Sequence, residues 1–270
     1  MTARRLALAL TLASCTQRAT RAPAPRPAPI VAPTPAPATL WTTAAPGLSW
    51  AMVDPGFDEA PTRLHWAVIR VDLARWSLDV RRSPDDRVAG LDGDVSVAAA
   101  VNGGFFEPDL SPSGLLACRG VTHGRRAPRG GSGVLTVRAG LAAVEAADAQ
   151  AEDFAGELAV QCGPRLVEEG GVVGVHRDDG RRFARTAACV RDGGRTVDLV
   201  TTWDPGAPLR GPGLLWFARR LAGPSPTGDA RGCERALNLD GGPSTGFYVR
   251  GAAGHPATGP TPWLLTVRAR

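Results

Sequence analysis

The apolar residues of the chain recur mainly with a period of two, the spacing that places alternate side chains on opposite faces of a β-strand. Runs with this alternation are bounded by Pro, Gly or Asp, which end strands and form turns. We therefore predict strands at residues 48–53, 64–73, 76–81, 134–138, 141–144, 158–162, 182–191, 196–203, 237–239, 247–249 and 263–267. The stretch 95–100 fits a strand and a helical turn equally well.

One segment follows helical spacing instead. Residues 212–221 place apolar side chains on one side of a helix and Arg219 and Arg220 on the other. Many strands with a single convincing helix predict an α+β fold, a single domain built on a largely antiparallel or mixed β-sheet with few helices. The chain contains no visible internal repeat.

The first fifteen residues have the features of an export signal, because two arginines precede an apolar run that is too short to span a membrane. The sequence Leu12-Ala13-Ser14-Cys15 resembles a bacterial lipobox, in which the Cys is lipidated and becomes the new N-terminus. We therefore expect Cys15 to anchor the protein in the cell envelope, and the absence of Asp after it favours the outer membrane. The alternative is a general secretory signal with a coincidental Cys.

Pro and Ala dominate residues 16–40, a composition that cannot bury a core and is typical of an extended, disordered tether. The working domain is then expected at residues 41–270. The net charge of +5 comes entirely from the five Arg of the first forty residues, so the domain itself is neutral. A neutral domain without a basic stripe argues against a nucleic-acid partner.

Four cysteines follow Cys15, namely Cys118, Cys162, Cys189 and Cys233. An even number in an exported protein allows two disulfides with three connectivities. Cys162 and Cys189 lie in apolar alternating stretches, so buried free thiols are an equal alternative. No CxxC spacing indicates zinc, and we predict no cofactor, leaving a divalent cation open.

The segment 235–248, RALNLDGGPSTGFY, changes abruptly from an apolar strand to a polar turn. Alternation places Asn238 and Asp240 on one side of the strand. Two glycines then allow close approach to the backbone, and Ser244 and Thr245 supply hydroxyls. An ordinary Asp-Gly hairpin turn is the alternative interpretation.

A second segment, AAAVNGGFF at residues 98–106, also runs from small apolar residues into an amide and two glycines. NGGFF, SPSGL at 111–115, VQCGPRLV at 160–167, ARTA at 184–187 and LNLDGGPST at 237–245 follow one another along the chain. Together these motifs resemble those of the phosphodiester glycosidase family, from about residue 48 to the C-terminus. The family pattern usually has Gly where this chain has Cys189, a departure that narrows the site or allows a disulfide.

The resemblance implies cleavage of a sugar-1-phosphodiester at the glycosidic carbon. Phosphate is a good leaving group, so such a site needs mainly a carboxylate for the anomeric centre or for water, and cationic or N–H donors for phosphate. Asp240 is the first candidate carboxylate, because it follows a buried strand where glycines open the backbone. Glu107, directly after NGGFF, is the second; only the distance between the two carboxyl groups decides whether they act as a pair.

Arg185 lies in an apolar run, where an unpaired charge is expensive, so we expect it to meet either a substrate phosphate or a carboxylate such as Asp240 or Glu107. The remaining predicted contacts are amides for sugar hydroxyls, glycine N–H groups that form an anion nest, and turn hydroxyls for phosphate or sugar. They are, in that order, Asn102, Asn238 and Gln161; Gly103, Gly104, Gly241 and Gly242; and Ser244 and Thr245.

The sequence therefore predicts an exported, lipid-anchored hydrolase of glycosyl phosphodiesters, for example an N-acetylglucosamine-1-phosphodiester, in envelope or extracellular glycans such as exopolysaccharide. Its expected partners are this glycan substrate and, through Cys15, the membrane. Two other classes remain open: a metal-dependent phosphodiesterase in which Asp240 and Glu107 hold a divalent cation, and a non-catalytic glycan-binding lipoprotein of the envelope.

Overall fold

Strands make up most of the regular structure in the computed structural model, which describes residues 40–55, 63–91, 93–150 and 154–270. All of these residues belong to the second of two compact units, residues 36–270. The predicted signal, residues 16–39 of the predicted tether and the predicted lipidation site Cys15 lie outside the described residues.

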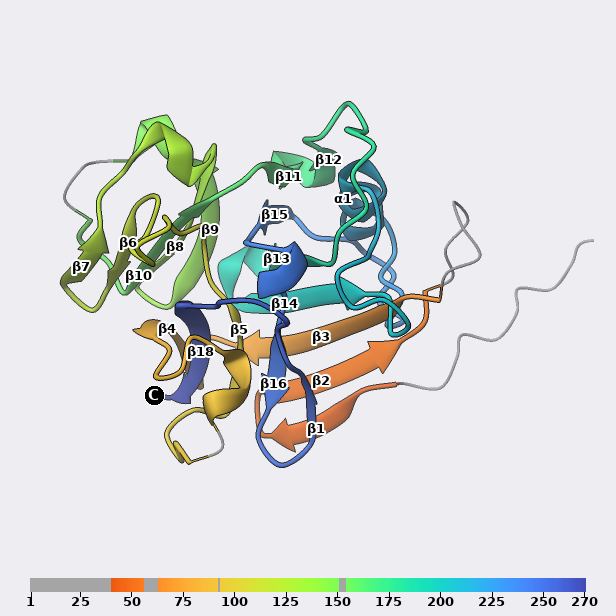
Figure 1. The fold of residues 1–270 in the computed structure, drawn as a ribbon, viewed down its shortest axis with the longest axis horizontal. Coiled ribbons are helices and arrows are strands. Elements are labelled where there is room, and N and C mark those ends of the chain that lie inside the picture. The colour runs from red at the N-terminus through yellow and green to blue at the C-terminus, as the bar shows by residue number, and fades with distance from the viewer. Residues whose placement is uncertain (1–39, 56–62, 92, 151–153) are drawn as a thin grey trace, which may run out of the picture. The chain divides into compact units, whose positions relative to one another are not determined.

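The strands form three antiparallel sheets (Figure 1). An eight-stranded sheet, here the large sheet, has the order β1-β2-β3-β14-β13-β15-β11-β12. The second sheet has the order β7-β6-β10-β8-β9, and the third has the order β17-β16-β5-β18-β4. The large sheet contains β1 (Thr42–Ala45), β2 (Leu48–Val53), β3 (His65–Asp72), β11 (Arg165–Glu168), β12 (Val172–Val173), β13 (Arg185–Arg191), β14 (Thr196–Trp203) and β15 (Arg235–Asn238). The other two contain β4 (Trp76–Arg82), β5 (Ala99–Asn102), β6 (Leu116–Cys118), β7 (Val121–Gly124), β8 (Gly133–Arg138), β9 (Leu141–Ala146), β10 (Leu158–Cys162), β16 (Phe247–Val249), β17 (Ala253–His255) and β18 (Trp263–Ala269).

The main hydrophobic core receives side chains from all three sheets. Representative buried members are Ile69 and Leu237 of the large sheet, Leu135 of the second sheet, and Val101 and Leu265 of the third. The second sheet is built from the contiguous residues 116–162, so the chain leaves the third sheet after β5 and returns to the large sheet with β11. This path brings the ends of β5, β10, β13 and β15 together.

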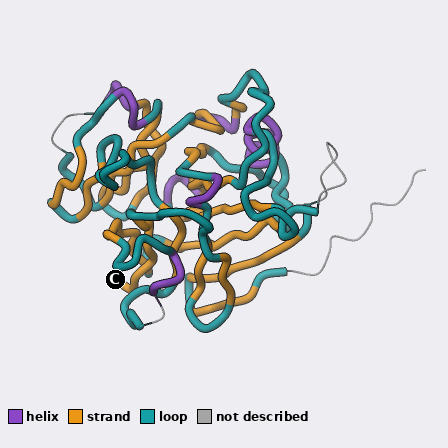
Figure 2. The backbone as a smooth tube through the Cα atoms, viewed as in Figure 1, coloured by secondary structure: helices purple, strands orange, loops and turns teal. Residues whose placement is uncertain are grey.

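The helix α1 (Leu214–Ala222) covers the other face of the large sheet, where it packs in a second apolar cluster with Trp66 of β3. Its buried residues are Phe217, Ala218 and Leu221, as its 3.6-residue spacing predicts. In the tube view, α1 is one of several purple segments among orange strands and teal loops (Figure 2), and the others in the described ranges are short 3-10 helices. Within the described ranges, no helix is long and apolar enough to cross a membrane.

The antiparallel sheets and the scarcity of helix agree with the predicted fold. The α+β label is only partly supported, because the described residues contain a single nine-residue α-helix beside three sheets. Strand β2 has the predicted bounds, and the 95–100 stretch resolves as a strand that begins later, at Ala99. The hairpin between β8 and β9 turns at Ala139 and Gly140, both with positive φ.

Two cysteines are joined and two are free. Cys189 in the middle of β13 forms a disulfide with Cys233, and Cys118 and Cys162 are buried free thiols. Both sequence interpretations are therefore partly correct: one disulfide is present, and it uses the position at which the chain departs from the family's Gly.

Candidate active site

Four chain segments meet where strands of the three sheets end, and they contain most of the predicted site residues. The Asp240 N–H donates to Gly103 O at 3.1 Å, which joins the LDGG turn to the NGG turn. The Gly242 N–H donates to Ala184 O at 2.7 Å, next to Arg185, and the Asn238 N–H donates to Pro164 O at 3.0 Å. These bonds bring residues 102–105, 161–164, 184–186 and 238–245 to one place.

Asn102 is the side chain that joins these segments. It is 1% exposed. Its Nδ2 donates to Asp240 O at 2.6 Å, and its Oδ1 accepts hydrogen bonds from Thr186 Oγ1 at 2.7 Å and from the Gly246 N–H at 3.2 Å. The amide is thus occupied by protein groups. Asn102 braces the turns, one of the two roles its residue type allows, and its predicted contact with a sugar hydroxyl stays a prediction.

Asn238 also holds together the place where the four segments meet, here called the junction, but its side-chain oxygen accepts no hydrogen bond from a described residue. Its Nδ2 donates to Gly163 O at 2.9 Å and to Leu239 O at 2.7 Å. Its Oδ1 and the Thr245 Oγ1 are buried and have no hydrogen-bond partner among the described residues. Buried polar atoms normally have partners, so these two atoms mark where water or a ligand would complete the site.

Asp240 lies at the end of this segment with its carboxyl group largely buried. Its Oδ1 accepts a hydrogen bond from the Gly241 N–H at 2.9 Å. Burial raises the pKa of Asp240, and the Ser244 hydroxyl and the Gly241 N–H oppose that rise. The Ser244 hydroxyl lies between this carboxyl group and Pro260 O, to which it donates at 2.9 Å. No ion pair involving Asp240 occurs in the described part of the chain.

The glycines permit close backbone approach, and the N–H groups of three of the four already have acceptors within the protein. The Gly103 N–H donates to Trp263 O, and the N–H groups of Gly241 and Gly242 are occupied by Asp240 Oδ1 and Ala184 O. A Cβ atom on Gly103, Gly104 or Gly241 would lie 2.8–2.9 Å from a backbone oxygen. Of these four glycines, only Gly242 has a positive φ, 59°. The N–H groups of Gly103, Gly241 and Gly242 are thus used within the protein, and the predicted anion nest stays a prediction.

Arg185 lies next to this junction at the start of β13, opposite Thr202 of β14. Its Nε donates to Pro212 O at 3.3 Å and its Nη2 donates to Arg181 O at 3.2 Å. Burial lowers the pKa of Arg185, and the charge of Asp179 partly offsets this effect. The described residues provide it with no carboxylate ion pair, so the predicted salt bridge to Asp240 or Glu107 is not formed.

Glu107 is held in a different arrangement. Its Oε2 lies 3.7 Å from Arg129 Nη1, and its N–H donates to Ser111 O in the turn after NGGFF. Glu107 is only partly exposed, whereas the Arg129 side chain is 80% exposed. Pairing with Asp240 in catalysis stays a prediction for Glu107.

Gln161 uses both atoms of its amide to hold neighbouring loops. Its Oε1 accepts hydrogen bonds from the N–H groups of Leu115 and Ala127, and its Nε2 donates to the carbonyls of Ala127 and Gly131. Its predicted substrate contact is untested, and the four backbone bonds indicate a bracing role.

Three aromatic side chains whose mutual contacts were not predicted from the sequence lie near the junction. His255 stacks on Trp203 with ring centroids 4.1 Å apart, and His65 meets the same ring edge-on at 5.2 Å. Burial lowers the pKa of His255 to about 4, and the charge of His65 adds to the effect. The loop after His255 contacts the turn, because the Thr258 N–H donates to Pro243 O at 2.9 Å.

Thr186 is the other residue missed from the sequence. It is fully buried, and its hydroxyl fixes Asn102 Oδ1. Its position in the ARTA motif, directly after Arg185, is the signal in the sequence that could have identified it.

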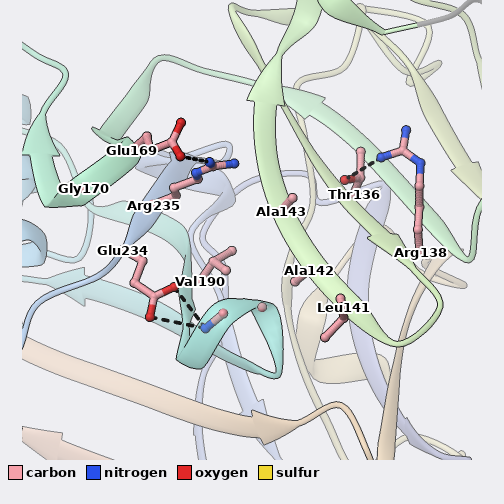
Figure 3. A pocket seen from close by; sticks show the side chains of 12 residues that line it. Thr136, Arg138, Leu141, Ala142, Ala143, Glu169, Gly170, Val190, Glu234 and Arg235 are labelled. Carbon is pink, nitrogen blue, oxygen red and sulfur yellow. Dashed lines mark hydrogen bonds and ion pairs between the residues drawn. The ribbon is translucent and has the colours of Figure 1, made fainter.

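A cavity of about 540 Å³ lies elsewhere, between the β8–β9 hairpin and the start of β15, and it contains none of the predicted site residues (Figure 3). Its charged groups are paired locally: Arg235 lies 3.1 Å from Glu169, and Glu234 accepts from the Gly193 N–H. Across the described ranges, no three His, Cys, Asp or Glu side chains are grouped to hold a metal ion.

Comparison with known proteins identifies one family model and a shared fold. The model for phosphodiester glycosidase matches residues 96–266, more than half of the chain. The catalytic domain of zebrafish N-acetylglucosamine-1-phosphodiester alpha-N-acetylglucosaminidase, auto-inhibited by pro-peptide, is 16% identical with a TM-score of 0.59, over 84% of this chain and 85% of that chain. A hypothetical protein from Synechocystis is 15% identical with a TM-score of 0.52, over 83% of this chain and 62% of that one.

The present chain thus spans less than two thirds of the Synechocystis protein. At these identities the two structures establish the fold alone. No curated protein sequence matches the chain significantly.

Proposed function

The chain belongs to the phosphodiester glycosidase family, and on this basis we propose that it hydrolyses a sugar-1-phosphodiester in envelope or extracellular glycans. Water attacks the anomeric carbon, and the bond from that carbon to the phosphate oxygen breaks. The sugar leaves with the oxygen of water, and the phosphomonoester leaves with the second proton. An N-acetylglucosamine-1-phosphodiester, the substrate in the name of the zebrafish neighbour, is the first candidate.

The state of Asp240 is the observation that carries this proposal. Its carboxyl group is largely buried where four segments meet, and its partners are the Gly241 N–H and the Ser244 hydroxyl. A carboxylate held without a neighbouring cation is available to stabilise positive charge at the anomeric carbon, or to accept a proton from the attacking water. Because phosphate leaves readily, the reaction needs little help from a general acid.

Arg185 is the proposed ligand of the phosphate. Its guanidinium group is mostly buried and has two backbone acceptors but no recorded carboxylate partner. An arginine in this state gains strongly from an anion, since charge-assisted bonds to phosphate are roughly twice as strong as neutral ones. Burial already disfavours its charged form, so a bound phosphate would also relieve that penalty.

The envelope location is proposed from the sequence and supported by chemistry in the fold. Disulfides persist in oxidising compartments outside the cytosol, and Cys189–Cys233 is such a bond. We propose export by the signal at residues 1–15, lipidation at Cys15 and attachment to the outer membrane. Mass spectrometry of the mature N-terminus tests this, because a lipidated Cys15 supports the anchor and an unmodified N-terminus elsewhere overturns it.

Hydrolysis in heavy-oxygen water tests the reaction. Label in the released sugar supports cleavage at the anomeric carbon, whereas label in the phosphomonoester indicates attack at phosphorus and contradicts the proposal. A chelator separates the metal-dependent alternative, since activity that survives complete chelation excludes it. Tight binding without turnover, equal in the wild type and Asp240→Asn, would instead indicate a glycan-binding protein.

A further inference from the structure

A second cavity, also of about 540 Å³, lies beside β10 and is lined by the ends of two loops. Gln161 lines it, whereas the next residue, Cys162, belongs to the main core. Successive strand residues point to opposite faces. The Gln161 face of β10 therefore lines this cavity, and the Cys162 face packs into the main core. Neither Asp240 nor Arg185 is among the residues that line the cavity.

Three side chains that line this cavity, those of Arg126, Ser132 and Arg165, have N–H or O–H groups that can donate further hydrogen bonds to a ligand. Arg126 is exposed and makes one long hydrogen bond, from Nη1 to Ala147 O at 3.4 Å, and it forms no ion pair with a described residue. Arg165 is half-buried, and its Nη2 lies 3.2 Å from Glu168 Oε1. The Ser132 hydroxyl has no recorded partner in the described structure. Two guanidinium groups and a hydroxyl that line one cavity suit the oxygens of a phosphate.

The charges around the cavity are mixed, which narrows the class of ligand. Asp148 is exposed and is the acidic residue in the lining, and Glu168 pairs with Arg165 just outside it. A bare anion would gain from the two arginines but meet the carboxylate of Asp148. A phosphorylated sugar can satisfy both, because a carboxylate accepts hydrogen bonds from sugar hydroxyls.

The cavity is preformed. The four backbone bonds of the Gln161 amide fix the loop that carries Arg126. Gly131, with φ of 104°, lies so close to β10 that a Cβ atom there would be 2.3 Å from the Cys162 carbonyl carbon. A preformed cavity loses less conformational entropy when it binds, and its volume lies within the range of roughly 300–1,000 Å³ that small-molecule sites occupy.

We infer that this cavity is a second glycan site, which binds a phosphorylated sugar unit through Arg126, Ser132 and Arg165 and contacts its hydroxyls through Asp148. The inference goes beyond the proposed hydrolysis and does not depend on it. A glycan with repeated phosphate groups would then be held at a point distinct from the bond that is cut.

Calorimetric titration of the full chain with glucose 6-phosphate tests the site. We expect saturable binding that weakens about tenfold in Arg126→Gln and in Arg165→Gln, the loss typical of one charge-assisted hydrogen bond. Arg125→Gln is the matched control, because Arg125 has the same charge in the same loop but does not line the cavity. Its affinity should stay within about twofold of the wild type.

Three results would overturn the inference: equal weakening in all three variants, which indicates general charge attraction; loss of binding in Arg185→Gln alone, which assigns the ligand to the hydrolytic site; and no binding by a folded wild-type chain. Ser132→Ala removes a donor from an exposed position and should weaken binding without affecting folding. The Ser132→Ala variant still tests the proposed site if the half-buried Arg165 proves necessary for stability.

Discussion

The side-chain amide of Asn102 donates a 2.6 Å hydrogen bond to the backbone carbonyl of Asp240, a residue 138 positions away in the sequence. This bond joins the third sheet to the large sheet at the proposed hydrolytic site. The other two partners of the same amide, Thr186 and Gly246, extend the connection to β13 and to the start of β16.

Asn102→Ala should therefore destabilise the protein strongly. Truncation leaves the Asp240 carbonyl, the Thr186 hydroxyl and the Gly246 N–H without a partner in a buried region, and we expect a loss of about 3 kcal/mol in the free energy of unfolding. Urea denaturation measures this loss. Thr186→Val, which removes one of the three bonds, is the matched comparison and should lose about 1 kcal/mol. Equal stability of Asn102→Ala and the wild type would show that the brace is dispensable.

Asp240→Asn should remove hydrolysis and keep the fold. The amide oxygen of Asn can still accept from the Gly241 N–H, whereas the negative charge is lost. We expect a fall of about a hundredfold or more in kcat, the size typical of a lost charge-stabilising group. Asp109→Asn, in an exposed turn that lies after NGGFF, is the control and should retain its rate. Full activity of a folded Asp240→Asn protein would contradict the assignment.

The acid limb of the pH–rate profile should lie above pH 3.8, the usual value for Asp. Burial raises the pKa of Asp240, and the reaction needs the ionised form, so kcat/KM should fall as the pH drops through this raised value. The Ser244 hydroxyl lowers the same pKa. Ser244→Ala should therefore move the acid limb of the pH–rate profile to higher pH. A shift to lower pH would contradict the assignment of this limb to Asp240.

The sequence predicted the elements whose signal is local. Alternation located β2 and β14, and helical spacing located α1, because in each case the buried face is continuous. Shorter strands such as β7 and β12 were missed, since residues of β7 are mostly exposed and β12 has only two residues. Each pairs with the strand just before it in the chain, β6 and β11 respectively, so the missing signal is the apolar alternation and not the distance to the partner strand.

The stretch 95–100, which the sequence left open between a strand and a helical turn, divides at the start of β5 for a physical reason. The Ser96 N–H and hydroxyl both donate to Asp94 Oδ1, which holds a turn before β5 begins at Ala99. At the site, the motifs brought Asn102 and Asp240 together correctly as segments. They did not reveal that the Asn102 amide and the N–H groups of Gly103, Gly241 and Gly242 already have hydrogen-bond partners within the protein, because partners across sheets leave no spacing signal.

Reduction of the Cys189–Cys233 disulfide should lower stability. The bond closes a loop with a sequence separation of 44, and loop-closure entropy for that length corresponds to about 4 kcal/mol at most. We expect the double variant Cys189→Ala/Cys233→Ala to unfold at a clearly lower temperature than the wild type in calorimetry. Cys118→Ala removes a buried thiol without breaking a bridge, and it should show a smaller change.

Stability should also decrease between about pH 6.5 and pH 4 through His255. Its folded pKa of about 4 lies below its usual value of 6.5, so the unfolded chain binds more protons in this window. The contribution of neutral His255 to the free energy of unfolding is fully present above pH 6.5 and is lost as the pH falls towards 4. After allowance for solvent screening it amounts to about 1 kcal/mol. His255→Gln should flatten this part of the pH–stability curve measured by denaturation, and an unchanged slope would exclude His255 as the cause.

The strand β18 occupies an interior position in the third sheet, between β5 and β4, although it is made of residues 263–269. Its first residue, Trp263, also accepts the hydrogen bond of the Gly103 N–H. During synthesis, β4 and β5 emerge long before the strand that joins them, so the third sheet must remain open until residues 263–269 have been released. A chaperone that shields these two waiting strand edges would thus act on a chain whose proposed catalytic turn is still unformed.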